Sequence, residues 1–244
     1  MSPIAVATRR NRIVRPPSVT IRNGLVAYWR LDEASGTRFD AIGANHLSDN
    51  NTVTQAVGKA QFAGQFTAAN SEFLSIADNP TLSWNMNQSF TISCWVYFDA
   101  LAVDQAMVAK FGGGAAEYVL SYDTNAGINK LRFAVYDTTA SGTPDKAYAN
   151  GIGTPATATW HHLVAGYCRA SHTIWIVGNG SAPDSVAVLS TPIGDTAAAF
   201  RIGSLDGTQW FMNGRIDGVG FWRRRPTPTE IAWLYNSGNG RDIF

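Results

Sequence analysis

The sequence predicts an all-β protein folded as a sandwich of two antiparallel sheets. Of its 244 residues 45% are hydrophobic and only 15% are charged, which supplies a two-layer core and excludes a disordered chain. Twenty-three glycines, with many Thr, Ser and Asn, indicate frequent turns. Ser89–Phe98 is the clearest strand, because apolar residues alternate strictly along it and many are β-branched or aromatic.

A basic arm comes first. Five of the 19 basic residues lie in residues 1–23, which hold no acidic residue, so 14 basic residues face 18 acidic ones in the rest of the chain. Pro16-Pro17 ends an extended stretch. We expect an arm over residues 1–23 and one domain over 24–244. A solvated tail is the alternative to a docking arm, whose contact residues would be Arg9, Arg10, Arg12 and Arg15.

No membrane span or export signal is expected. Residues 1–20 lack the apolar core of a signal peptide, and no run of about 18 apolar residues occurs anywhere. Cys94 and Cys168 have no metal-ligand spacing, and Cys94 shares a strand face with Phe90 and Ile92. We therefore expect two free thiols and synthesis in a reducing cytoplasm.

From Gly24 onward, short strands alternate with turns, and no helix separates them. A polar loop from Asp32 to Asn51 interrupts the series early. Turn signals stand at 112–114, 125–127, 141–142 and 178–180. The expected strands are Leu25–Trp29, Gln61–Thr67, Phe73–Ile76, Ser89–Phe98, Ala106–Lys110, Tyr118–Tyr122, Lys130–Tyr136, Trp160–Tyr167, Thr173–Val177, Ser185–Ser190, Phe200–Gly203 and Gly214–Trp222.

One short helix is predicted near the C-terminus. Thr227 and Glu230 form a capping box, and Pro228 occupies the first helical position. Ile231 and Leu234 then share one face, and Gly238 ends the turn. We expect this helix to cover the sandwich and to carry no chemistry.

Four stretches, taken together, resemble the laminin G-like branch of the concanavalin A-like lectin/glucanase superfamily. They are GLVAYWRLDEASGTRFDAIGANHL, FLSIADNPTLSWNMNQSFTISCWVYF, TWHHLVAGY with IWIVGNG, and RIGSLDGTQWFMNGRIDGVGFWRRRPTPTEIAWLYNSGNG. Each alone is only a strand with a turn, but all four occur in the family's order. The resemblance implies a jelly-roll sandwich with a binding function, although some members are β-glucanases or lyases.

Catalysis is not expected. Glycoside hydrolysis needs two carboxyl groups roughly 5–10 Å apart, and the glucanases place theirs on alternate residues of one strand. The chain has four glutamates, Glu33, Glu72, Glu117 and Glu230, and none has an acidic residue two positions away on a strand. The adjacent His161 and His162 are expected to pack or to form hydrogen bonds inside the sandwich.

The resemblance also implies a structural Ca²⁺ site. The family's loop and its "IDEV" motif map onto Asp40 and Asp217, with Gly43, Asn45 and His46 as further ligands. Gly218 and Ala44 depart from the family's Glu and Asn. The alternative is that both carboxylates cap turns or accept backbone amides.

Sugar binding in lectin relatives uses exposed aromatic rings and amides. Most of the eight tryptophans, notably Trp29, Trp95 and Trp160, are better explained as core residues. Two sets of residues are candidates for glycan binding: Trp210 with Gln209 and Asn213, and Tyr122 with Asp123 and Asn125.

Two functions remain open. The first is a phage virion protein, either a capsid decoration or a head or tail fibre, anchored by its arm to a capsid or tail protein and displaying a lectin-like domain on the virion surface. The second is a bacterial carbohydrate-binding or adhesion module, secreted or on the cell surface. A homo-oligomer is compatible with both. Nucleic acid is a remote third partner, because the arm has no interleaved aromatic residues and the body is acidic.

Overall fold

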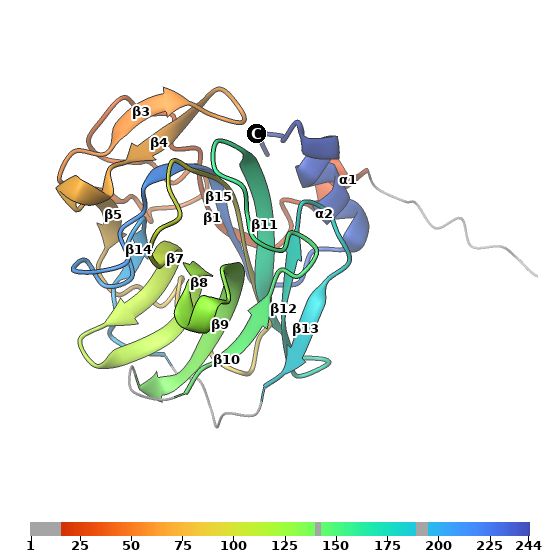
Figure 1. Ribbon diagram of the computed structural model, residues 1–244. Helices are drawn as coiled ribbons and strands as arrows, with labels where there is room; N and C mark the ends of the chain where they lie inside the picture. The colour runs from red at the N-terminus through yellow and green to blue at the C-terminus, as the bar shows by residue number, and fades with distance from the viewer. Residues whose placement is uncertain (1–15, 140–142, 189–194) are drawn as a thin grey trace, which may run out of the picture.

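The computed structural model describes residues 16–139, 143–188 and 195–244. In these residues the strands form two antiparallel sheets packed face to face (Figure 1). One sheet has the strand order β13-β12-β11-β6-β15-β4-β3, with β1 also paired to β15. The other has the order β10-β9-β8-β7-β14-β5-β2. The predicted two-sheet sandwich is confirmed.

The eight-stranded sheet contains the two termini of the sandwich. Its strands are β1 (Leu25–Trp29), β3 (Thr54–Val57), β4 (Phe62–Phe66), β6 (Phe90–Phe98), β11 (Trp160–Cys168), β12 (Thr173–Gly178), β13 (Asp184–Ala187) and β15 (Gly214–Trp222). The seven-stranded sheet consists of β2 (Ser48–Asn50), β5 (Phe73–Ile76), β7 (Gln105–Gly112), β8 (Ala115–Asp123), β9 (Lys130–Thr139), β10 (Asp145–Tyr148) and β14 (Phe200–Ile202).

Three of these strands lie outside the expected ones. They are β2, inside the expected polar loop, and β3 and β10. All three are short, and no residue of β2 or β3 is buried. Because they carry no alternating apolar pattern, sequence periodicity could not find them. The turn expected at 141–142 lies outside the described residues.

The core lies between the sheets, and Phe90 is near its centre. The Phe90 ring lies 5.7 Å from Phe221 of its own sheet, and 5.2 Å from Tyr118 and 5.9 Å from Phe133 of the opposite sheet. Cys94 projects into the same core, and burial raises the pKa of its thiol to about 12. Both cysteines are free, as expected.

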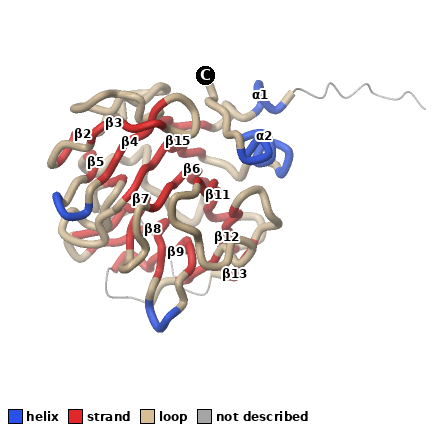
Figure 2. The backbone as a smooth tube through the Cα atoms, turned by 45° about the horizontal axis from the view of Figure 1, so that its top comes forward, coloured by secondary structure: helices blue, strands red, loops and turns tan. Residues whose placement is uncertain are grey.

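Helical segments are few and short in the described part of the chain, and strands dominate it (Figure 2). The helices are α1 (Pro17–Thr20) and α2 (Pro228–Tyr235), with 3₁₀ turns η1 (Ala68–Asn70), η2 (Asn125–Gly127) and η3 (Asn236–Gly238). None of the helices in this part is long and apolar enough to cross a membrane.

The C-terminal helix has the predicted capping box. The Thr227 side chain accepts from the Glu230 amide, and the Glu230 carboxylate accepts from the Thr227 amide at 2.7 Å. Arg224 binds both oxygens of Glu230, at 2.7 and 2.8 Å. Burial alone would raise the pKa of Glu230, but the hydrogen bonds from Arg224 and Thr227 lower it to about 2. The helix ends at Tyr235, with Asn236 as a left-handed C-cap, and the 3₁₀ turn η3 that follows it ends at Gly238, as expected.

Residues 17–23, which were expected to belong to the arm, are part of the folded body. Pro17 begins α1, where a missing amide hydrogen costs nothing. Ile21 is fully buried, and its carbonyl accepts from the Trp222 indole at 2.7 Å. Arg22 donates to the Ile243 carbonyl at 2.9 and 2.7 Å, so the root of the arm is tied to the C-terminal tail.

A buried ion pair holds two loops against the seven-stranded sheet. Lys110 is fully buried and donates to Asp78 at 2.8 Å, to Glu117 at 2.7 Å and to the Thr196 carbonyl at 2.7 Å. The other oxygen of Glu117 accepts the Trp84 amide at 2.9 Å. Burial is the main cause that raises the pKa of Glu117. The pair is thus a requirement of the fold, since neither charge reaches water.

Lys110→Met should lower the free energy of unfolding by about 3 kcal/mol, because Glu117 would stay buried without its cation. Urea denaturation of the variant and the wild type measures the difference. Lys130→Met, which removes a lysine that bonds only to Asn150 near the surface, should change stability by less than about 0.5 kcal/mol. Equal stabilities for Lys110→Met and the wild type would contradict this account.

Candidate functional site

Exposure separates the tryptophans into two groups. Of the eight, Trp29, Trp84, Trp95, Trp175 and Trp222 are buried. The other three, Trp160, Trp210 and Trp233, are only half-buried. Trp95 is buried although it faces outward from its sheet. Trp160 was expected to be a core residue, and this expectation was wrong, since its side chain is half-buried. The half-buried rings are the ones that a ligand can reach.

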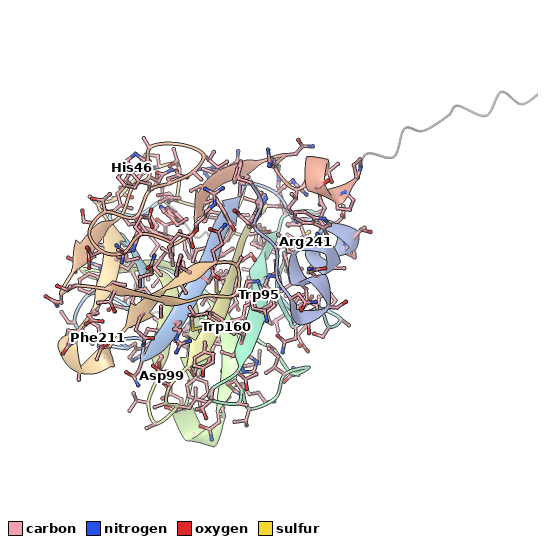
Figure 3. The ribbon with its side chains drawn as sticks, turned by 90° about the horizontal axis from the view of Figure 1, so that it is seen from above. His46, Trp95, Asp99, Trp160, Phe211 and Arg241 are labelled. Atoms are coloured by element: carbon pink, nitrogen blue, oxygen red, sulfur yellow. The ribbon has the colours of Figure 1, made fainter. Side chains whose placement is uncertain are left out.

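Trp210 forms one wall of an open groove at the rim of the seven-stranded sheet. The groove has a volume of about 430 Å³, which is within the usual range for small-ligand sites. It lies between the loop after β6, the end of β8 and the loop joining β14 to β15; Figure 3 labels Phe211 at this rim. Its lining residues are Ala68, Ala102, Val103, Asp104, Thr124, Trp210 and Phe211.

The loop that carries Trp210 is fixed by its own hydrogen bonds. The Asp206 carboxylate accepts the amides of Thr208 at 2.8 Å and Gln209 at 3.1 Å. The Trp210 carbonyl accepts the Ala106 amide of β7 at 2.9 Å. Trp210 itself has a φ of 55°, a left-handed conformation that is strained for a bulky residue. The surrounding bonds hold this conformation, which turns the ring toward the groove.

A buried ion pair lies beside the Trp210 ring. The Arg132 guanidinium lies 5.0 Å from the ring centroid and donates to Asp123 at 2.9 Å. Asp123 also accepts from the Tyr148 hydroxyl at 3.0 Å. Burial alone would raise the pKa of Asp123, but Arg132 and the hydrogen bonds from Asn125 and Tyr148 hold it below its ordinary value. This carboxylate therefore fixes Arg132 under the tryptophan and is no proton donor.

The polar groups of the groove come from Asp104 and Thr124. One Asp104 oxygen accepts the Thr124 amide at 2.6 Å and its hydroxyl at 2.7 Å. This arrangement fixes a carboxylate next to two aromatic rings, Trp210 and Phe211. A sugar can stack its apolar face on such rings while its hydroxyls donate to a fixed acceptor.

The predicted residues of the first glycan group have different roles. Trp210 lines the groove. The exposed Gln209 side chain donates back to Asp206 at 2.9 Å, and the Asn213 side chain accepts the Ala68 amide at 3.4 Å. Gln209 and Asn213 therefore support the loops around Trp210.

The second predicted group does not form a stacking site. Tyr122 is 2% exposed and belongs to the core between the sheets, because it and Asp123 project to opposite faces of β8. Its hydroxyl donates to Asn129 at 3.2 Å. Asn125 is exposed in the η2 turn, where its amide caps Asp123 at 3.0 Å. The prediction that Tyr122 stacks on a sugar is therefore wrong, because its ring is buried.

Sequence analysis missed Asp104, Thr124, Phe211 and Arg132. They come from three loops and one strand that are far apart in the chain, and none belongs to a recognisable local motif. The alternation along β9 places Arg132 on one face with Ala134, opposite Phe133, but periodicity alone does not tell which loop covers that face.

The Asp40 loop is tightly closed by hydrogen bonds. One Asp40 oxygen accepts the amides of Tyr28 at 3.0 Å and Ile42 at 2.9 Å. The other accepts the Asn45 amide at 3.2 Å and its side chain at 3.1 Å. Gly43 lies so close that a Cβ there would come within 3.2 Å of this oxygen. Both Asp40 oxygens thus face N–H donors.

The remaining predicted calcium ligands are also engaged. The Asn45 side-chain oxygen accepts from Asn79 and Thr81, each at 2.8 Å, and the His46 ring accepts the Asp40 amide at 3.1 Å. Asp217 accepts the amides of Lys59 at 2.6 Å and Ala60 at 2.9 Å, in a different turn. Burial raises the pKa of Asp217 to about 7, even though these amides lower it.

As arranged, these residues do not fit a calcium ion. N–H groups point at the oxygens that a cation would need, and the described residues contain no cluster of three His, Cys, Asp or Glu side chains suited to a metal. The arrangement favours the alternative in which both carboxylates accept backbone amides. The calcium site stays a prediction without support from the donor geometry.

The thermal midpoint should be the same in about 1 mM Ca²⁺, roughly the dissociation constant of a weak extracellular site, as in EDTA. A ligand that binds only the folded state raises the midpoint, so differential scanning fluorimetry is a direct test. A rise with Ca²⁺ that Asp40→Asn abolishes would restore the calcium site.

The groups considered for catalysis are also engaged in the structure. Glu117 is paired with Lys110, and Glu230 with Arg224. Glu33 accepts the Phe39 amide at 2.8 Å, and Glu72 accepts the Thr67 amide at 2.7 Å. Full burial lowers the pKa of His162 to about 3, and its ring lies 3.2 Å from the Ser93 hydroxyl. These contacts are structural.

Comparisons with solved structures agree with this architecture. The binding domain of Paraclostridial Mosquitocidal Protein 1 is similar with a TM-score of 0.71 and 16% identity, over 89% of this chain and 53% of that one. This chain thus spans about half of that toxin domain. Domain 4 of AbnA, an extracellular arabinanase from Geobacillus stearothermophilus solved with arabinotriose, has a TM-score of 0.63 and 17% identity, over 89% and 98%. Trypanosoma rangeli sialidase is similar with a TM-score of 0.61 and 17% identity, over 90% of this chain and 34% of that one.

No curated protein sequence is significantly similar to the chain. The profile of the concanavalin A-like lectin/glucanase superfamily matches residues 68–232, which reach from η1 into α2 and include every residue of the Trp210 groove. The chain therefore belongs to the concanavalin A-like lectin/glucanase superfamily.

Proposed function

We propose that the chain is a non-catalytic glycan-binding protein and that the Trp210 groove is its binding site. The observation that carries the proposal is the placement of Trp210 and Phe211 beside the fixed carboxylate of Asp104 in an open groove. Rings of this kind stack on sugars, and an open groove admits an oligosaccharide from either end. The likeness to an arabinanase domain solved with arabinotriose supports a carbohydrate ligand.

A hydrolytic role fits the groove poorly. Asp104 is the one acidic side chain among its lining residues, whereas glycoside hydrolysis uses two carboxyl groups of which one acts as a proton donor. The nearby Asp123 is buried, ion-paired and holds a lowered pKa. The likeness to a sialidase concerns the fold only.

Trp210→Ala should weaken the binding of arabinotriose by about fivefold or more, because stacking of a sugar ring on tryptophan contributes about 1 kcal/mol. Isothermal titration measures it, with a panel of neutral oligosaccharides as further probes. Trp233→Ala removes another half-buried tryptophan, on α2, and should leave the affinity unchanged. No binding by the wild type across the panel, or equal affinity for both variants, would contradict the proposal.

For the biological role, we propose a phage virion component that carries the lectin-like domain outward. The support is the arm, where Arg9, Arg10, Arg12 and Arg15 stand without an acidic neighbour, and the position of its root. The root at α1 lies beside α2, on the side of the domain away from Phe211 (Figure 3). An arm docked on a capsid or tail protein would leave the groove pointing outward, at the virion surface. The four arginines themselves lie outside the described residues.

The other candidate is a secreted or cell-surface carbohydrate-binding module of a bacterium, which the same groove would serve. The two differ in whether the arm is needed for attachment. A deletion that tests this should end at residue 15, because α1 and Ile21 are part of the folded body.

Deletion of residues 1–15 should leave the thermal midpoint and glycan binding unchanged but abolish attachment to virus particles, as measured by co-sedimentation. The physical reason is that the arm supplies cations for an acidic partner surface, and the groove is built without it. Substitution of the four arginines by glutamine in the full chain should have the same effect. Attachment that survives both changes would favour the adhesion module.

A further inference from the structure

The outer face of the eight-stranded sheet carries a row of half-buried planar side chains. Trp160, Tyr97, Arg215 and Gln65 are direct cross-strand neighbours on β11, β6, β15 and β4. All four are half-buried and face away from the core. We call them the Trp160 platform. In Figure 3 a line from Asp99 through Trp160 and Trp95 leads along this face toward Arg241.

The platform exists because α2 and the C-terminal tail cover only part of the face. Trp95, two residues before Tyr97 on β6, is buried: its ring lies 5.9 Å from Tyr235 of α2, and Gly240 packs against it. Beyond Trp95 this cover ends. Tyr97 and Trp160 are therefore left half-exposed on a surface of regular strands.

The side chains of the platform are held in place before any ligand arrives. The rings of Tyr97 and Trp160 are 5.5 Å apart, and the Arg215 guanidinium lies 4.6 Å from the Tyr97 centroid. Arg215 donates to Gln65 at 3.0 Å, and Gln65 in turn donates to Asp99 at 3.0 Å. A surface fixed in this way loses little conformational entropy when it binds.

Arg215 of the platform and Lys59, which lies nearby on the same face, have no carboxylate partner. Among the described residues, the ion pairs involve other arginines and Lys110, and neither Arg215 nor Lys59 is within ion-pair distance of an acid. Lys59 places its ammonium 5.0 Å from the Trp95 ring. Asp217 is close in sequence to Arg215, but it accepts the Lys59 backbone amide rather than the side chain. The face thus offers two positive charges to an anion.

The combination of stacking ring and neighbouring guanidinium matches one kind of ligand. The Arg215 guanidinium already lies over the Tyr97 ring, so a pyranose ring would stack on Trp160, the next ring along the row. Its exocyclic carboxylate would then point toward Arg215, whose planar fork binds carboxylates in bidentate fashion. Nucleic acid fits less well, since it needs a longer series of cations to neutralise its phosphates.

We propose that the Trp160 platform binds an acidic polysaccharide of the uronic-acid type, at a site separate from the Trp210 groove. Trp160 stacks on a sugar ring, and Arg215, held over the Tyr97 ring, pairs with a sugar carboxylate. Lys59, beside Trp95 on the same face, adds a second positive charge. The site is independent of the proposed function of the groove, because no residue of one lines the other.

The test uses the full chain with polygalacturonate as probe, in affinity electrophoresis and isothermal titration. Trp160→Ala and Arg215→Gln should each weaken binding by about tenfold, and added salt should weaken it further. Trp210→Ala and Lys130→Gln, which change the groove and a cation of the other sheet, should leave it unchanged. Trp160→Phe should restore most of the affinity, which separates stacking from a folding defect.

Several results would overturn the proposal: no binding of polygalacturonate by the wild type, binding that neither Trp160→Ala nor Arg215→Gln weakens, or equal binding of neutral galactan. Binding of single-stranded DNA as strong as that of polygalacturonate, and lost in the same variants, would assign the platform to nucleic acid instead. If Trp160→Ala lowers the thermal midpoint by several degrees, its binding result is set aside and Arg215→Gln decides whether the proposal holds. The Arg215 side chain is half-buried on the outer face of the sheet, so this substitution should leave the fold intact.

Discussion

Each sheet of the sandwich can turn only one face into the shared core, and the rest of the structure depends on this constraint. Phe90 contacts Phe221 within its own sheet and Tyr118 and Phe133 across the core, so the inner positions of four strands are fixed together. Because side chains alternate along a strand, fixing the inner set also fixes the outer one. The same rule buries Tyr122 and places Tyr97 outside.

The two outer faces are covered in different ways, and both candidate binding surfaces lie where a cover ends. On the eight-stranded sheet, α2 and the C-terminal tail bury Trp95 and leave Trp160 reachable. On the seven-stranded sheet, the loop between β14 and β15 packs Leu205 and Trp210 against a small second cluster, and its edge forms the groove. Burial of apolar strand surface holds each cover in place.

Charge is distributed according to whether water can reach it. The inaccessible cations Lys110 and Arg132 each have a carboxylate partner, since a lone buried charge would be too costly to retain. Arg215 and Lys59, which lack such a partner, are among the cations that lie half-exposed on an outer face. The buried charges thus have structural roles, and the charges proposed to bind a ligand are ones that water reaches.

The sandwich, most strands, the capping box of α2 and the free thiols could be predicted from the sequence, because each depends on local alternation, a short cap or a turn. Trp210 was also singled out, and the structure places it in the lining of a groove. The sequence could not determine which rings are exposed, since exposure of Trp160 and burial of Trp95 depend on where a helix from a distant segment lies. Asp104, Thr124 and Phe211 meet only after three loops converge. The donors around Asp40 come from β1 and from its own loop, and the sequence does not show that these segments direct their amides at the carboxylate.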